Sequence, residues 1–188
     1  MPAPIVWLLA LNLAGFGVEL ALGEDAITLG ALWPLGAGFA PWQLLTSAFL
    51  HAGIAHLATN MFGLWMFGRD VARVLGARWF LALYGASVLS AALAQLAVTS
   101  LGDPVPTLGA SGGVFGVLGA FAMLFPRRPV ALLFPPVVLP SRVFVVVYAL
   151  IELASGMEGW NAGVAHYAHL GGLAGGWWVM RRWRRAAA

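Results

Sequence analysis

The chain of 188 residues is 61% hydrophobic and only 9% charged, with a mean hydropathy of +0.88. Soluble domains are about 45–50% apolar and about 25% charged, so this composition excludes an ordinary soluble domain and predicts a membrane protein. The formal net charge is +3, and every basic residue is an arginine beside an apolar segment. That placement favours contact with lipid headgroups over nucleic acid. The chain has no cysteine, which excludes disulfides and thiol chemistry.

Six apolar segments follow one another along the chain, and each predicts a transmembrane helix. They cover approximately residues 5–22, 53–67, 79–98, 111–125, 142–154 and 164–180. The first contains a carboxylate, Glu19, which we attribute to snorkelling toward the membrane surface. We therefore predict a single domain over residues 1–188, an all-α polytopic bundle of six helices.

Two segments depart from a simple span. Residues 23–50 are rich in Gly, Pro and Trp, which predicts a connection that lies at or partly in the membrane surface. The span at 111–125 has 15 residues and would cover only about 22 Å of a roughly 30 Å hydrocarbon core. We expect this helix to begin below one membrane surface, at a depth that water still reaches.

The arginines predict the orientation of the bundle. With six spans, all ten fall on one side of the membrane, whereas Glu24, Asp25, Asp103 and Glu158 fall on the other. The positive-inside rule then places both termini in the cytoplasm.

A serine among glycines, Ser111, begins the short fourth helix in the stretch Gly109-Ala-Ser-Gly112. Gly112 and Gly116 alone indicate close helix packing, with the serine as a small interface residue. Flanking glycines also allow a tight turn that uncovers the hydroxyl, as in a nucleophile elbow. The remainder of the chain has to decide between these two interpretations.

Polar side chains inside the other spans favour the second interpretation. His56 and Asn60 are four residues apart on one face of the second helix, and both can donate to a developing oxyanion. His51 and His166 lie at loop edges, where we expect them to form interhelical hydrogen bonds.

His169 shares a face of the sixth helix with Gly172 and Gly176. If these glycines pack against Gly112 and Gly116, His169 meets Ser111 and can act as its base. No Asp or Glu lies near His169 on its own helix, so we predict a Ser/His dyad and not a triad.

Together, these three motifs resemble the rhomboid intramembrane serine proteases in their minimal six-helix bacterial form. The motifs are Gly109-Ala-Ser-Gly112, His56-Leu-Ala-Thr-Asn60, and Ala168-His-Leu-Gly-Gly172 followed by Gly176. The resemblance implies that Ser111 is the nucleophile and His169 the general base. It also implies an oxyanion hole formed by His56, Asn60 and the Ser111 amide. Family members cleave transmembrane segments near the outer leaflet, in the periplasmic or extracellular half of the membrane, which implies a bacterial inner-membrane enzyme with transmembrane protein substrates.

Two positions depart from the family pattern. The first loop usually carries Trp-Arg, whereas this chain has Trp42-Gln43, which puts the hydrogen-bonding role of that arginine in doubt. The aromatic residue four positions after the serine is often Tyr and is Phe115 here, which can stack on His169 but has no hydroxyl.

Other function classes fit less well. A proteolytically silent relative that binds or chaperones membrane proteins is the main alternative, although such relatives typically lack the serine or the histidine. A transporter would place polar groups at several depths, whereas here they cluster toward one side. A metalloprotease is disfavoured because H-E-x-x-H is absent. We expect no metal and no cofactor, and the sequence carries no prediction of oligomeric state.

Overall fold

The computed structural model describes residues 1–99, 105–132, 136–158 and 165–187. Within these residues the chain forms seven α-helices, one 3-10 helix and one β-hairpin. The elements in chain order are α1 (Ala3–Leu22), α2 (Glu24–Gly30), α3 (Gln43–Thr46), η1 (Ser47–Phe49), α4 (Ile54–Thr99), α5 (Ser111–Leu124), β1 (Pro129–Ala131), β2 (Val138–Pro140), α6 (Ser141–Glu158) and α7 (His166–Ala187). Among the described residues, α1 and α4 are long and apolar enough to cross a membrane, and α5 is a shorter apolar helix.

The second and third predicted spans are the two arms of α4. Gly76 interrupts the helix with φ 72° and ψ 168°, a backbone conformation that glycine adopts without steric cost. The predicted end of the second span at residue 67 is wrong, because the helix continues past Arg69 and Asp70 to the kink. These charged residues are the last turns of the first arm and not a loop.

A β-hairpin and two helix ends also differ from the prediction. The fold is not purely helical, since β1 and β2 pair antiparallel, with Val130 opposite Leu139. Pro129, the first residue of β1, lies opposite Pro140, the last residue of β2, at one end of the pairing, where an edge strand tolerates a missing N–H. In addition, α6 continues to Glu158 beyond the predicted end at 154, and α7 continues to Ala187 beyond 180.

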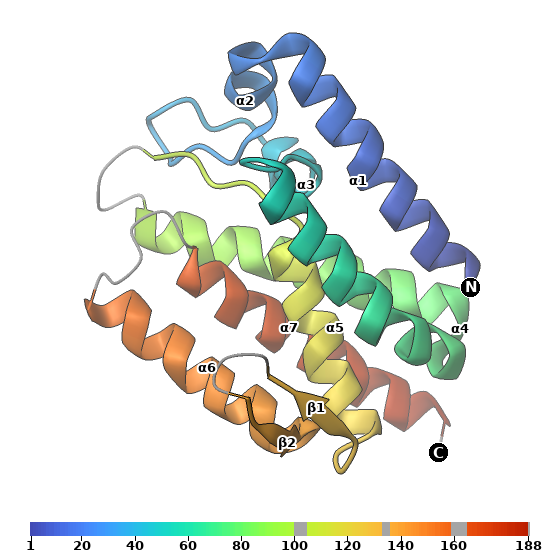
Figure 1. The fold of residues 1–188 in the computed structure, drawn as a ribbon. Helices are drawn as coiled ribbons and strands as arrows, with labels where there is room; N and C mark the ends of the chain where they lie inside the picture. The colour runs from blue at the N-terminus through green and yellow to red at the C-terminus, as the bar shows by residue number, and fades with distance from the viewer. Residues whose placement is uncertain (100–104, 133–135, 159–164, 188) are drawn as a thin grey trace.

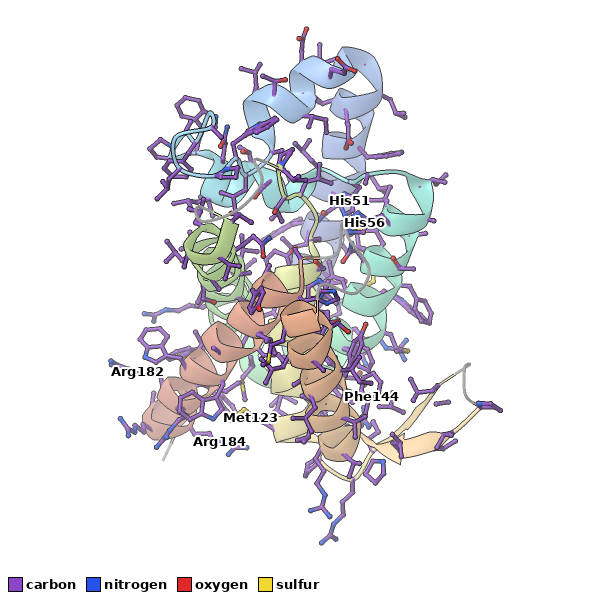
Figure 2. All side chains as sticks on the ribbon, turned by 90° about the vertical axis from the view of Figure 1, so that its left-hand side faces the viewer. His51, His56, Met123, Phe144, Arg182 and Arg184 are labelled. Atoms are coloured by element: carbon purple, nitrogen blue, oxygen red, sulfur yellow. The ribbon has the colours of Figure 1, made fainter. Side chains whose placement is uncertain are left out.

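The bundle has two distinct ends (Figure 1). α2 lies at one end, whereas the β1–β2 hairpin and the C-terminus lie at the opposite end. His51 and His56 lie together in the half toward α2, and Arg182 and Arg184 lie at the other end (Figure 2). Arg184 donates from Nη2 to the carbonyl of Met123 at 2.8 Å, so the end of α7 is tied to the last turn of α5.

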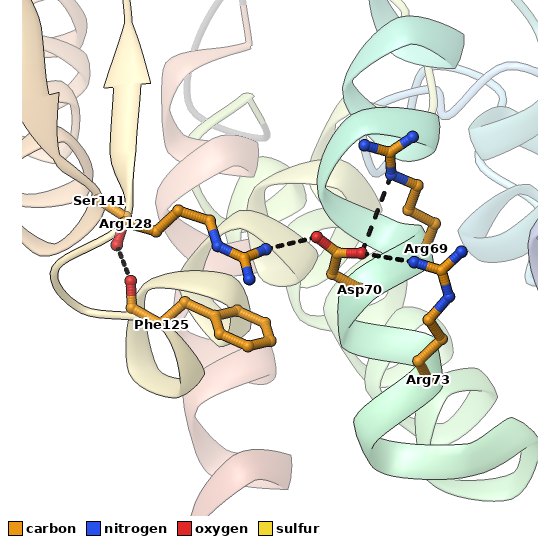
Figure 3. Close-up of polar contacts among 6 residues, drawn as sticks. All are labelled: Arg69, Asp70, Arg73, Phe125, Arg128 and Ser141. Carbon is orange, nitrogen blue, oxygen red and sulfur yellow. Dashed lines mark hydrogen bonds and ion pairs between the residues drawn. The ribbon is translucent and has the colours of Figure 1, made fainter.

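A cluster around Asp70 holds the arginine-rich end together (Figure 3). Asp70 forms ion pairs with Arg69, with Arg73 at 2.9 Å, and with Arg128 from the turn after α5. In the same region Ser141 donates from Oγ to the carbonyl of Phe125 at 2.6 Å. The end of the first arm of α4, the end of α5 and the start of α6 therefore lie together on one side of the bundle.

The centre of the fold is the contact of α5 with α7 and with the second arm of α4. An added Cβ at Gly172 would clash with the Gly112 carbonyl, and one at Gly176 would lie 2.7 Å from Gly116 Cα. On the α4 side, a Cβ at Gly116 would clash with the Ser87 side chain. Gly172 thus lies against Gly112 and Gly176 against Gly116, which brings α5 and α7 into contact at their backbones.

Candidate active site

Ser111 is the first residue of α5, immediately after a tight turn. Gly109 adopts φ +128°, a conformation that side-chain-bearing residues rarely adopt, and Ala110 precedes the helix with helical dihedrals. The serine is half-buried, and its helix begins among amides that have no intrahelical carbonyl partner. The turn thus places a hydroxyl beside backbone donors.

His169 of α7 meets Ser111 across the glycine contact. His169 Nε2 lies 2.9 Å from Ser111 Oγ, within hydrogen-bonding distance. Phe115, one turn along α5, stacks on the imidazole with ring centroids 4.1 Å apart and planes 6° apart. The Phe115 ring, which carries no hydroxyl, therefore packs against one face of the His169 imidazole.

The expectation that His169 has no carboxylate partner is wrong. Glu152 of α6 places Oε2 2.9 Å from His169 Nδ1 and 2.6 Å from His166 Nδ1. The hydrogen bond expected for His166 is therefore present. Sequence reasoning sought an acid on the helix of His169 and missed one on the preceding helix. The signal was available, since an ionisable residue in an apolar span indicates a functional site by default.

His56 lies over the loop that precedes Ser111. An added Cβ at Gly109 would lie 2.8 Å from His56 Nε2 and 3.8 Å from Ser111 Oγ, so both groups flank this glycine. On the other side of the ring, Nδ1 accepts the Ala52 N–H at a long 3.4 Å. An accepting Nδ1 leaves the proton of a neutral imidazole on Nε2, which then faces the serine as a donor.

Asn60 is buried one turn below His56 on α4. Its Nδ2 donates to the His56 carbonyl at 3.1 Å, which occupies one of the two amide protons. Among the described residues, the His56 carbonyl is the acceptor for this amide group. Asn60 therefore stabilises the helical turn that carries His56, whether or not it also donates to a ligand.

The first loop is hydrogen-bonded to the segment that carries the serine. Leu32 and Thr107 form an antiparallel bridge through bonds of 2.8 and 2.9 Å, and the Gly109 N–H donates to the Ser47 carbonyl at 2.9 Å. Residues far apart in sequence thus fix the turn before Ser111.

Gln43 organises this loop from within, at the position where the family usually has arginine. Its buried Oε1 accepts the Trp33 N–H at 3.2 Å and the Ala40 N–H at 3.1 Å, and its Nε2 donates to the Gly38 carbonyl at 3.3 Å. A neutral amide therefore satisfies three backbone groups of the loop.

Glu19 of α1 accepts the backbone N–H of His51 at 2.8 Å, so its carboxylate has a partner within the protein. The His51 ring is fully buried and packs edge-on against His56, with centroids 5.2 Å apart. Within the described residues, neither ring nitrogen of His51 has a hydrogen-bond partner. The interhelical bond expected for the His51 ring is therefore absent from this part of the chain.

A small cavity of about 30 Å³ lies behind the serine. Its polar lining includes Ser47, Gln95, Thr107 and Ser111. Oε1 of Gln95 is buried with no hydrogen-bond partner among the described residues. Apolar side chains such as Leu32 and Val88 make up most of the remaining lining, and the volume is enough for one or two waters.

A family model also matches this chain. The Rhomboid domain covers residues 39–185, which include α3 to α6, α7 as far as Arg185, and every residue of the site described above except Glu19, Leu32, Trp33 and Gly38.

Individual relatives match at moderate identity. The chain is 37% identical over 154 residues to Rhomboid protein 1, mitochondrial, of Saccharomyces cerevisiae, and 35% identical over 139 residues to Rhomboid protease GluP of Bacillus subtilis. It is 34% identical over 143 residues to the Presenilin-associated rhomboid-like protein, mitochondrial, of Homo sapiens. These alignments cover 74%, 73% and 73% of this chain but only 42%, 25% and 36% of the relatives. On these matches and on its apolar helices, the chain is a membrane protein that belongs to the rhomboid family.

Proposed function

We propose that this protein is an intramembrane serine endopeptidase that hydrolyses peptide bonds in or near transmembrane segments of other membrane proteins. The observation that carries the proposal is the 2.9 Å contact between Ser111 Oγ and His169 Nε2 at the first residue of a short apolar helix. A serine hydroxyl is a weak nucleophile until a base takes its proton. The family includes a relative named as a protease, GluP.

The chemistry follows from this contact. His169 Nε2 takes the Ser111 proton as Oγ bonds to the scissile carbonyl carbon, and the carbonyl electrons move to the oxygen. When the tetrahedral intermediate collapses, the C–N bond breaks and the proton passes from Nε2 to the leaving nitrogen. Water then attacks the acyl-enzyme with the same base, and Ser111 is released.

His56, Asn60 and the Ser111 amide supply the oxyanion hole in this proposal. The supporting geometry is the Nε2 face of His56 over Gly109 and the free amides at the start of α5. Donors fixed before the reaction stabilise a developing oxyanion without reorganisation. His56 is the best-supported oxyanion donor, because its Nδ1 accepts the Ala52 N–H and the ring proton is therefore on Nε2.

The substrate is a transmembrane helix. An intact helix hides its carbonyls in internal hydrogen bonds, so a segment weakened by Gly, Ala or Pro unwinds more readily into the site. His56 lies in the half of the bundle toward α2, away from Arg182 and Arg184 (Figure 2).

Membrane orientation is inferred from the arginines. Six spans, counting the two arms of α4 separately, place the arginine-rich end and both termini on the cytoplasmic side. The site then faces the periplasmic or extracellular side of a bacterial inner membrane. The relatives include both bacterial and mitochondrial proteins, so the same rule would apply to the matrix side in a mitochondrion.

The test combines cleavage with active-site labelling. Ser111→Ala and His169→Ala are each expected to abolish cleavage of a model transmembrane substrate in liposomes, and a fluorophosphonate probe is expected to label wild type at Ser111 only. The control is Thr59→Ala, which removes an exposed hydroxyl bonded only within its own helix and should leave both signals intact. Cleavage by either site variant would refute the Ser/His assignment. A folded wild type that neither labels nor cleaves would favour a silent membrane-protein-binding relative.

A further inference from the structure

Glu152 bridges two histidines with one oxygen. Its Oε2 lies 2.6 Å from His166 Nδ1 and 2.9 Å from His169 Nδ1. The three side chains are only 5%, 9% and 11% exposed, for Glu152, His166 and His169 respectively. Because a carboxylate only accepts hydrogen bonds, this arrangement fits both rings as Nδ1–H donors.

The two donors compensate a charge in an apolar setting. An ionised carboxylate inside a membrane-spanning bundle is costly unless it is paired and hydrogen-bonded. Bonds from an N–H to a carboxylate are about twice as strong as neutral ones. His166 and His169 are three residues apart on α7, so they share a face and can reach the same oxygen.

The bond to Glu152 also determines which nitrogen of His169 can act as a base. A neutral imidazole carries one N–H, and if Nδ1 donates it to Glu152, Nε2 is left with a lone pair. That lone pair lies toward Ser111 Oγ, 2.9 Å away. The opposite tautomer could not accept the serine proton.

We propose that Glu152 is a positioning residue that fixes the Nδ1–H tautomer of His169 and stabilises its imidazolium, and that His166 is the second donor that holds the carboxylate in place. This inference rests on the proposed hydrolase function of the same site. The serine proton moves to Nε2 while Oγ bonds to the carbonyl carbon, and the imidazolium formed is balanced by the Glu152 charge. Glu152 takes no proton, and Nε2 later gives its proton to the leaving nitrogen.

The first experiment separates kcat from KM in wild type and Glu152→Gln, reconstituted in liposomes with a model transmembrane substrate. The amide keeps the shape but not the charge, and its NH2 group can hold His169 in the wrong tautomer. We expect kcat to fall about 10²- to 10⁴-fold while KM changes less than about threefold. Glu152→Asp, which retains the charge, should recover part of kcat. Leu153→Ala, an exposed neighbour on α6, is the matched control and should match wild type.

Two variants of His166 test its role as the second hydrogen-bond donor to Glu152. His166→Asn retains an N–H donor and should lower kcat by less than about tenfold, whereas His166→Leu removes it and should lower kcat further. A kcat for folded Glu152→Gln within about threefold of wild type would overturn the proposal. An equal kcat for His166→Asn and His166→Leu would overturn the part assigned to His166.

A readout independent of proteolysis comes from nitrogen-15 spectra of histidine-labelled protein in detergent. We expect wild-type His169 as the Nδ1–H tautomer, with a strongly downfield Nδ1 proton that Glu152→Gln shifts. Should Glu152→Gln fail to fold, the wild-type spectrum still decides, because an Nε2–H tautomer of His169 would overturn the inference. An inactive wild type with the Nδ1–H tautomer would instead refute the protease function and leave the positioning of His169 intact.

Discussion

α7 and α6 both contribute a group to the site, but they are attached to α5 in different ways. α7 packs backbone to backbone, since a Cβ at Gly176 would lie 2.7 Å from both the Cα and the carbonyl oxygen of Gly116. α6 makes contact through side chains, with Tyr148 stacked on Phe115 at 5.2 Å and Glu152 bonded to the histidines. The contact that carries the proposed proton transfer is therefore fixed by backbone.

Within the part of the chain that the structure describes, the outer face of α6 is exposed. Val146, Leu150 and Ile151 are 59%, 60% and 53% exposed, as expected for side chains that face lipid. An apolar cleft of about 310 Å³ opens between α6 and the α5–α7 pair, lined by Gly119, Val145, Ala149, Leu173 and Trp177 among others. The position of α6 thus depends on few contacts. Substitutions on α6 should therefore lower the activity more gradually than substitutions on α7.

Gly176→Leu should have the largest effect, because the added side chain meets backbone atoms of α5 that cannot rotate away. Overpacking typically costs about 1–3 kcal/mol, and separating the helices also lengthens the distance between Ser111 and His169. We expect loss of cleavage and a lower Tm in detergent. Gly85→Ala is the matched control, since its Cβ would meet nothing within 4 Å. Wild-type cleavage by Gly176→Leu would show that the glycine contact does not position the site.

Phe115→Leu should have an intermediate effect. The substitution removes the ring that stacks on His169 at 4.1 Å, and aromatic pairs contribute about 0.5–1.5 kcal/mol beyond their buried area. We expect kcat to fall up to about tenfold, with cleavage assays on folded protein as the measurement. Phe62→Leu, the same change at an exposed position, should behave as wild type. An unchanged kcat for Phe115→Leu would mean that the hydrogen bonds alone orient His169.

Tyr148→Leu should have the smallest effect of the three. Tyr148 stacks on Phe115, which separates it from His169 in the stack, so its loss weakens the α6 contact without exposing the imidazole face. We expect a fall in kcat of about two- to threefold, measured beside Phe115→Leu. A larger loss for Tyr148→Leu than for Phe115→Leu would show that the α6 contact matters more to the site than the ring that stacks directly on His169.

Prediction from sequence works where the information is local. The positions of Ser111 at a helix start, and of His169 with Gly172 and Gly176 on one face, follow from helical periodicity. Their partner glycines at 112 and 116 have the same spacing, so the meeting of α5 and α7 could be expected before the structure. The predicted break between the second and third spans contains the kink at Gly76, but the same logic does not show that the helix continues through the charged residues before it.

The sequence by itself determined the membrane character of this protein, the arginine-rich end, and the pairing of Ser111 with His169. Each of these depends on composition or on a repeat within one helix. Only the tertiary structure decided that Glu152 reaches both histidines, that Gln43 satisfies the first loop, and that Glu19 bonds to His51. Those contacts join elements whose relative rotation and depth no local pattern specifies, and a hydrogen bond requires both to within a fraction of an ångström.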